Sequence, residues 1–162
     1  NISSPLIFCL LSFRSVIDGF IIMLQKEVVE RLVAEPDNKS YGVPSVILQM
    51  FAEVEKVLDV PATCFYPRPK VEPAGIKGDF RERPRVSLED EEFFTHLVKA
   101  AFAQRRKMLM NNLKNAKLLD GLPEAKLKEA LSSTGIDGKR RGETLSLIEF
   151  GKLSNILKNA KD

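Results

Sequence analysis

The sequence predicts an α/β part over residues 1–84 and an all-α part over residues 85–162. Apolar runs alternate with helical patterns in the first part, whereas every periodic segment in the second part is helical. The charge balance changes at the same place. Residues 1–84 carry 10 basic and 11 acidic side chains, and residues 85–162 carry 15 and 11. The stretch from Gly78 to Arg85, rich in charge, glycine and proline, is typical of a boundary.

The composition predicts a folded protein and excludes several classes. Hydrophobic residues are 44% of the 162 residues and charged residues 29%, which is enough for a packed core. Cys9 and Cys64 lie far apart and His96 is the single histidine, so a disulfide scaffold, a zinc site and a Ser–His or Cys–His hydrolase are poor explanations. We expect both thiols in the core and His96 to be structural or solvent-facing. We predict no metal, because no cluster of metal ligands is present.

Two further features concern the whole protein. Free thiols suit a reducing compartment, and no apolar run is long enough to cross a membrane, so we expect a cytoplasmic protein without a membrane partner. The chain opens on Asn1 rather than on methionine, inside a segment that already has a structured pattern. We therefore expect the C-terminal part of a longer protein.

The first part is predicted element by element. Ser4 followed by Pro5 is typical of a helix start, which predicts a helix to about Ser12. The continuous apolar run over 18–25 predicts a strand covered on both faces. A helix over 26–35 follows, and proline then ends it.

In the rest of the first part, one segment fits both a helix and a strand pattern. Pro44 can start a short helix that ends at Ala52. Residues 53–60 alternate like a half-buried strand, with Val54 and Leu58 on one side, although 46–58 also fits a helical period. Both interpretations stay open there, and 71–77 predicts a last strand.

The second part predicts three helices. Ser87 with Asp90 resembles a capping box for a long helix to about Asn115. A helix from Pro123 through Leu131 is stopped by Gly135. A capping box at 146–149 starts the third helix, which runs through residue 157.

On the long helix the basic residues gather opposite a broad apolar side, and between residues 93 and 119 there is no Asp or Glu. Arg105 is the exception, since it projects into the apolar side, and we expect it to be buried with a carboxylate. Such a stripe is either a solvated face or a site for nucleic-acid phosphates, to which amide side chains can also donate. The candidate residues are Lys99, Gln104, Arg106, Lys107, Asn111, Asn112, Lys114 and Lys117.

The segment 65–71 (FYPRPKV) is the most unusual local sequence. Two prolines stiffen it, an aromatic pair begins it, and Arg68 and Lys70 follow. It could present the ring of Phe65 for stacking on a base, with positive charge at hand for phosphate. The alternative, which the local pattern alone favours, is a rigid crossover whose Phe fills the core.

Several segments, in order along nearly the whole chain, resemble motifs of the ribosomal RNA adenine dimethyltransferases, the KsgA family. They are 1–6 (NISSPL), 23–28 (MLQKEV), 40–42 (SYG) with 45–46 (SV), 65–71, 101–107 (AFAQRRK) with 111–113 (NNL), and 135–137 (GID) with 143–146 (ETLS). The chain differs at 43–44 (VP for the usual Arg-Leu) and at 72–75 (EPAG for Asp-Ser-Ala-Val), so we expect the last strand to be weak or bulged.

The resemblance implies the C-terminal strands and helices of a class I (Rossmann-like) methyltransferase sheet, followed by a small three-helix RNA-docking domain. It implies methyl transfer from S-adenosylmethionine to two adjacent adenines near the 3′ end of 16S small-subunit ribosomal RNA. Phe65 occupies the position that stacks on the target base, and Asn1 lies next to the missing Asn-Leu-Pro-Tyr catalytic motif. The half that binds the methyl donor is also missing, so we expect no S-adenosylmethionine on this chain and no activity from it alone.

A second function class stays open: a non-catalytic module for ribosomal RNA binding or ribosome assembly, with the α/β part as a platform. A DNA-binding helix-turn-helix is a weak third alternative, because the connection from Leu131 to Ser146 is too long for that motif. The predicted strands would form a partial sheet with an uncovered edge, and such an edge tends to pair with another chain. We therefore predict a dimer, or a bound N-terminal piece, at this edge.

Overall fold

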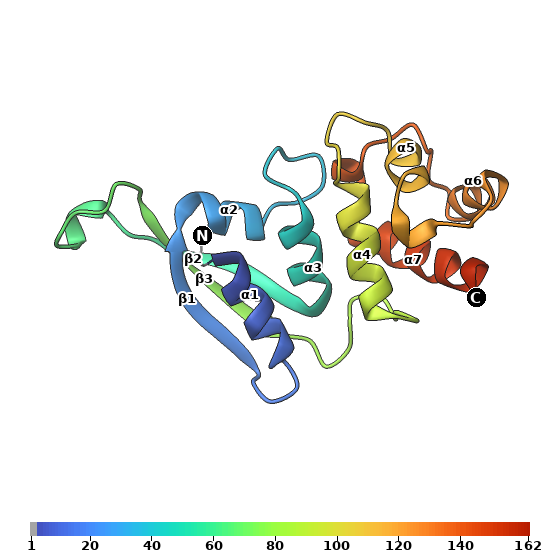
Figure 1. Ribbon diagram of the computed structural model, residues 1–162. Coiled ribbons are helices and arrows are strands. Elements are labelled where there is room, and N and C mark those ends of the chain that lie inside the picture. Colours follow the sequence, from blue (N-terminus) through green and yellow to red (C-terminus); the bar gives the residue numbers. More distant parts are fainter. Residues whose placement is uncertain (1–2) are drawn as a thin grey trace.

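The computed structural model describes residues 3–162 (Figure 1). Asn1, predicted beside the catalytic motif, lies outside the described residues. The first part contains α1 (Ser3–Ser12), β1 (Gly19–Gln25), α2 (Lys26–Leu32), α3 (Val43–Phe51), β2 (Ala52–Asp59) and β3 (Pro73–Phe80). The second contains α4 (Glu91–Ala101), α5 (Leu109–Lys114), α6 (Glu124–Ser133) and α7 (Leu147–Lys161).

The three strands form one sheet in the order β1-β3-β2. The central strand β3 is antiparallel to both neighbours, so β1 and β2 run in the same direction. The chain passes from β1 to β2 through α2 and α3, the helical crossover that strands of equal direction require. Helices α2 and α3 contact the sheet, and α1 contacts α3 (Figure 1).

The sheet is covered on one face only within residues 3–162. On β1, Phe20, Ile22 and Leu24 pack against the core. The alternate residues Ile21 and Met23 point to the other face and are 71% and 50% exposed. The prediction that this strand is covered on both faces is therefore wrong for the described residues.

The two open interpretations of 46–58 are both partly right, because a helix passes directly into a strand. Helix α3 ends at Phe51, and Ala52 is already extended, with φ −138°. A bulge between Lys56 and Leu58 then shifts the register of β2 against β3. Val54 lies opposite Gly78 and Leu58 opposite Gly75, so the two apolar side chains point to opposite faces and not to the predicted common side.

Strand β3 begins at Pro73 and holds the centre of the sheet, so it is not the weak strand that its sequence predicts. The bulge that we expected near it lies instead in its neighbour β2. A Cβ at Gly75 would meet Leu58 Cγ at 3.1 Å and Val57 Cγ2 at 3.2 Å. Glycine therefore lets the bulged residues lie directly over the central strand.

The single long helix predicted from Ser87 to Asn115 is wrong. The helix starts at Glu91, because Asp90 rather than Ser87 is its N-cap and accepts a 2.8 Å hydrogen bond from the Phe93 amide. It ends at Ala101, turns occupy 102–108, and α5 begins at Leu109. The described part after residue 85 thus has four α-helices where we predicted three.

The later helix signals are confirmed. Gly135 follows α6 with φ +72°, the left-handed conformation that glycine adopts most easily. The Ser146 hydroxyl accepts from the Glu149 amide at 3.2 Å, and the Glu149 carboxylate accepts from the Ser146 amide at 2.8 Å. This capping box starts α7.

One hydrophobic core joins the two parts. Phe51 of α3 meets Phe94 of α4 edge-on at 6.5 Å between ring centroids, and Phe102 stacks on Phe150 of α7 at 5.9 Å. Both cysteines are exposed, so the prediction that they belong to the core is wrong. None of the helices described is long and apolar enough to span a membrane.

Candidate nucleic-acid interface

A groove of about 720 Å³ lies between α4, the turn 102–108, α5 and the short 3-10 helix Lys117–Leu119. Amide and basic side chains dominate its polar lining: His96, Lys99, Gln104, Lys107, Asn111 and Lys117. No carboxylate of residues 3–162 lines it. The groove can therefore attract anions and donate hydrogen bonds to them.

Five of these six residues are sequence-predicted contacts, and the break in the helix brings them together. Lys99 comes from α4, Gln104 and Lys107 from the turn, Asn111 from α5, and Lys117 from the 3-10 helix. A straight helix would have spread them along its axis. The broken helix folds back, so that they surround one concave surface.

Asn112 holds the break in place. Its side-chain amide is buried and donates to the carbonyl oxygens of Ala101, at 2.8 Å, and Gln104, at 3.1 Å. The sequence suggests Asn112 as a donor to phosphate, but its amide is used inside the protein. Asn111, one residue earlier, lines the groove beside it.

The cations of the predicted stripe differ in whether a carboxylate neutralises them. Lys114 forms a 2.6 Å ion pair with Glu124, which also pairs with Lys128 at 2.9 Å. Hydrogen bonds from these two lysines lower the pKa of Glu124 to about 2. Lys99, Arg106, Lys107 and Lys117 have no ion pair with any described residue. Their charge is available to a ligand, whereas Lys114 does not line the groove and is already paired with Glu124.

Arg105 has a carboxylate partner, as predicted, but it is not buried. Its Nη2 donates to Glu143 at 3.1 Å and to the Lys39 carbonyl at 2.6 Å, and its side chain is 55% exposed. The predicted burial is wrong because Arg105 lies in the turn after α4 and not on a helix face.

The second candidate surface is the loop between β2 and β3. Phe65 is 37% exposed and Tyr66 is fully exposed, so the alternative in which Phe65 fills the core is wrong. The base of the loop is closed by a 3.1 Å hydrogen bond from the Val60 amide to the Pro73 carbonyl. The Lys26 Nζ lies 3.6 Å from a carboxylate oxygen of Asp59 and 3.6 Å from one of Glu72. The negative charge of Asp59, and then that of Glu72, raises the pKa of Lys26.

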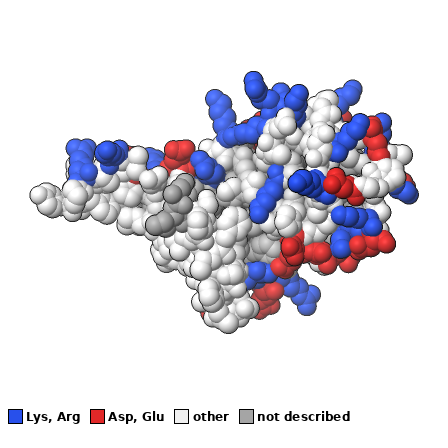
Figure 2. Space-filling model, viewed as in Figure 1, with Lys and Arg blue, Asp and Glu red and all other residues white. Residues whose placement is uncertain are grey.

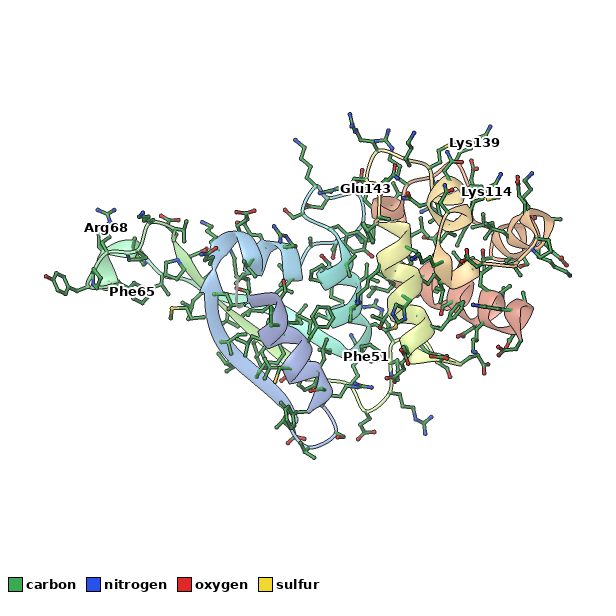
Figure 3. All side chains as sticks on the ribbon, viewed as in Figure 1. Phe51, Phe65, Arg68, Lys114, Lys139 and Glu143 are labelled. Atoms are coloured by element: carbon green, nitrogen blue, oxygen red, sulfur yellow. The ribbon has the colours of Figure 1, made fainter. Side chains whose placement is uncertain are left out.

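The loop and the groove lie far apart. In Figure 3, Phe65 and Arg68 lie at the tip of the projecting loop, across the sheet from Lys114 and Lys139. Arg68 and Lys70 are exposed and have no ion pair in the part of the chain that is described. The two surfaces can therefore contact only separate parts of one large ligand.

Sequence reasoning did not assign His96 and Asn115 to the groove. His96 is exposed, and its Nδ1 lies within hydrogen-bond distance, 3.0 Å, of the Glu92 carbonyl oxygen. Its Nε2 has no partner among the described residues. The signal that could have found both is the acid-free run 93–119, which contains them.

The chain matches known proteins along nearly its whole length. The family model for ribosomal RNA adenine dimethylase matches residues 1–158. The chain is 48% identical over 160 residues to ribosomal RNA small subunit methyltransferase A of Bacillus pumilus, covering 98% of this chain and 54% of that protein. It is 49% identical over 158 residues to the protein of the same name in Bacillus mycoides, covering 96% and 53%.

Two solved structures are similar in fold. A dimethyladenosine transferase from Plasmodium falciparum superimposes with a TM-score of 0.72 at 26% identity, covering 94% of this chain and 61% of that one. The 23S rRNA methyltransferase ErmE gives a TM-score of 0.66 at 21% identity, covering 98% and 62%. The chain spans about half the length of the curated relatives it matches. On this match the chain belongs to the ribosomal RNA adenine dimethylase family.

Proposed function

We propose that the whole protein transfers methyl groups to two adjacent adenines near the 3′ end of small-subunit ribosomal RNA. Family membership carries this proposal, together with the groove and the exposed Phe65 ring on this chain. Residues 85–162 serve as the RNA-docking domain, and residues 1–84 complete the methyltransferase domain.

Phe65 stacks on the target adenine. The exocyclic amine of adenine is a weak nucleophile, so holding it in line with the methyl group provides much of the catalysis. The base must leave its stack to react, and stacking on an aromatic ring offsets part of that cost. The exposed ring, on a loop closed at its base by Lys26, suits this role.

S-adenosylmethionine supplies the methyl group when bound, and we assign none of its contacts to this chain. The glycines that approach other atoms most closely do so against the protein itself: a Cβ at Gly78 would meet the Phe20 ring at 2.4 Å, and one at Gly142 the Ala101 carbonyl at 2.7 Å. They pack the fold and form no cradle for a nucleoside. We expect this chain alone to be inactive, and methyl transfer to small ribosomal subunits by the 162-residue chain would contradict this.

Methylation assays on a protein of the relatives' length test the role of Phe65. Phe65→Ala should cut methyl incorporation into small ribosomal subunits at least about tenfold, because stacking contributes about 1–3 kcal/mol per base. Subunit binding should change little, because the groove is intact. The matched control is Phe13→Ala, which removes an exposed ring just before β1, at the end of the sheet opposite the loop. Equal small losses in both assays would show that Phe65 only packs, and would favour the non-catalytic RNA-binding module.

We also propose that the sheet binds another chain, a second copy or an N-terminal piece, at its exposed edge. Ile21, Met23, Val57 and Leu58 are exposed on or beside it, and β1 and β2 are both edge strands. Such surfaces associate readily. Light scattering should give a mass above that of one chain, and a monomer at micromolar concentration would contradict the proposal.

A further inference from the structure

Tyr66 is the large apolar side chain with the greatest exposure among the described residues. It is 102% exposed, which is the accessibility of an isolated residue. The other tyrosine, Tyr41, is buried, and its hydroxyl donates to the Leu145 carbonyl at 2.9 Å. The hydroxyl of Tyr66 has no hydrogen bond with any described residue, and its ring pairs with no other ring of residues 3–162. The ring is therefore free to contact another molecule.

The loop between β2 and β3 presents this ring in a defined place. The short 3-10 helix Ala62–Cys64 comes directly before the aromatic pair, and the Phe65 amide donates to the Ala62 carbonyl at 3.3 Å. Pro67 and Pro69 follow, and each proline fixes its own φ angle. A preformed loop loses little conformational freedom when a ligand binds, and a tyrosine ring has only two torsions to order.

The side chains of Phe65 and Tyr66 point to opposite sides of the loop. The backbone of Phe65 is extended, with φ −119° and ψ 144°. Tyr66 precedes Pro67, and a residue before proline is restricted to extended conformations. Successive side chains alternate between the two sides of an extended backbone. The two rings therefore cannot stack on the same base, but they can stack on two bases of one strand, one on each side of the loop.

The loop also has the charge that suits a nucleic acid. Residues 60–71 include Arg68 and Lys70 and no Asp or Glu. The flanking carboxylates, Asp59 and Glu72, both pair with Lys26. In Figure 2 the projecting loop shows basic side chains on this face and no acidic side chain at its tip. Exposed rings beside cations are the combination that binds unpaired nucleotides, which favours a base over an apolar protein partner.

We propose that Tyr66 stacks on the nucleotide next to the target adenine, while Phe65 stacks on the target itself. The loop then lies between two adjacent unpaired bases, with one ring against each base and with Arg68 and Lys70 beside the phosphates of that strand. The inference rests on the proposed function, because it takes RNA with two adjacent reactive adenines as the substrate. When one adenine is the target, the other is the purine that Tyr66 holds.

Tyrosine fluorescence of the 162-residue chain tests the contact at the ring itself. The chain has two Tyr and no Trp, and Tyr41 is buried, so RNA that stacks on Tyr66 quenches the emission of that residue. The probe is a single-stranded RNA of about five nucleotides with two adjacent adenines at its centre. Saturating RNA should remove most of the emission that Tyr66→Phe lacks. The remaining emission of Tyr66→Phe, from Tyr41, should not change.

The affinity for the same RNA, measured by fluorescence anisotropy of an end-labelled probe, tests what the ring contributes. Tyr66→Ala should bind at least about fivefold more weakly, because it loses one stacked base. Tyr66→Phe keeps the ring and should bind within about twofold of the wild type. The matched control is Val71→Ala, which removes a 49% exposed apolar side chain from the same loop. It should also bind within about twofold of the wild type.

A second RNA separates stacking from a general effect on the loop. It has the same length and the same phosphates, but a single adenine lies between two abasic sugars. Either ring can take that one base, so Tyr66→Ala should weaken the binding of this RNA by no more than about twofold. The difference between the two RNAs is the contribution of the second stacked base.

Three results would overturn the proposal. They are constant emission up to about 1 mM RNA, an equal loss of affinity in Val71→Ala, and an equal loss in Tyr66→Ala for both RNAs. The measurements need no methyl donor and no ribosomal subunit, which separates them from the test of the proposed function. A failed methylation assay leaves a positive stacking result intact. A negative stacking result leaves methyl transfer and the role of Phe65 untouched.

Discussion

Asn112 shows how one side chain decides the local path of the chain. Replacing it with Ala removes the donor to the Ala101 and Gln104 carbonyls. We expect Asn112→Ala to lower the free energy of unfolding in urea by about 1–3 kcal/mol, because buried carbonyls lose their partner. Asn111→Ala, whose side chain faces the groove, should change it by less than about 0.5 kcal/mol. Equal losses would show that the amide of Asn112 has no special role.

Tyr41 predicts a dependence of stability on alkaline pH. Its buried hydroxyl donates to the Leu145 carbonyl at 2.9 Å, and burial, then the charge of Glu149, raise its pKa. The folded state therefore keeps a proton that the unfolded state releases near pH 10, so stability is lost as pH rises above that value. Between about pH 8 and pH 11 the unfolding free energy of the wild type should fall more steeply than that of Tyr41→Phe. Parallel curves would contradict this.

At the scale of elements, Gly142 allows a short 3-10 helix to pack against the end of α4. A Cβ there would meet the Ala101 carbonyl oxygen at 2.7 Å. Gly142→Ala should lower the unfolding free energy by about 1–3 kcal/mol, because the contact cannot open without moving backbone. Gly42→Ala is the control, since its added Cβ meets only Pro44 Cδ, at 4.0 Å. Thermal unfolding of both variants tests the difference.

The sequence predicted those elements whose signals are local. The Ser146–Glu149 capping box and the stop at Gly135 depend on neighbouring residues alone, and both are confirmed. The break after Ala101 could not be predicted, because the apolar period continues through Leu109 and Leu113 while the interactions that end the helix come from Asn112 and Gly142. The acid-free run still identified five groove residues, since it depends on composition and not on helix geometry.

At the scale of the whole molecule, the groove and the stripe make different predictions about Lys114. Charge reversal of the groove lysines, K99E/K107E/K117E, should weaken binding to small ribosomal subunits and reduce the salt slope by about 2–3. Lys114→Gln should have little effect, because Lys114 does not line the groove and is paired with Glu124. Filter binding at two salt concentrations tests both variants. Unchanged binding by the triple variant would mean that the groove faces solvent and does not contact the ribosomal subunit.

The shared core has a consequence for how a substrate could be selected. Rings from α3, α4 and α7 pack across both parts, so the Phe65 loop and the groove keep a fixed separation. An RNA can contact both only if its target bases and the segment bound at the groove are spaced to match. Inserting base pairs between them should therefore weaken binding even when every contacted nucleotide stays the same.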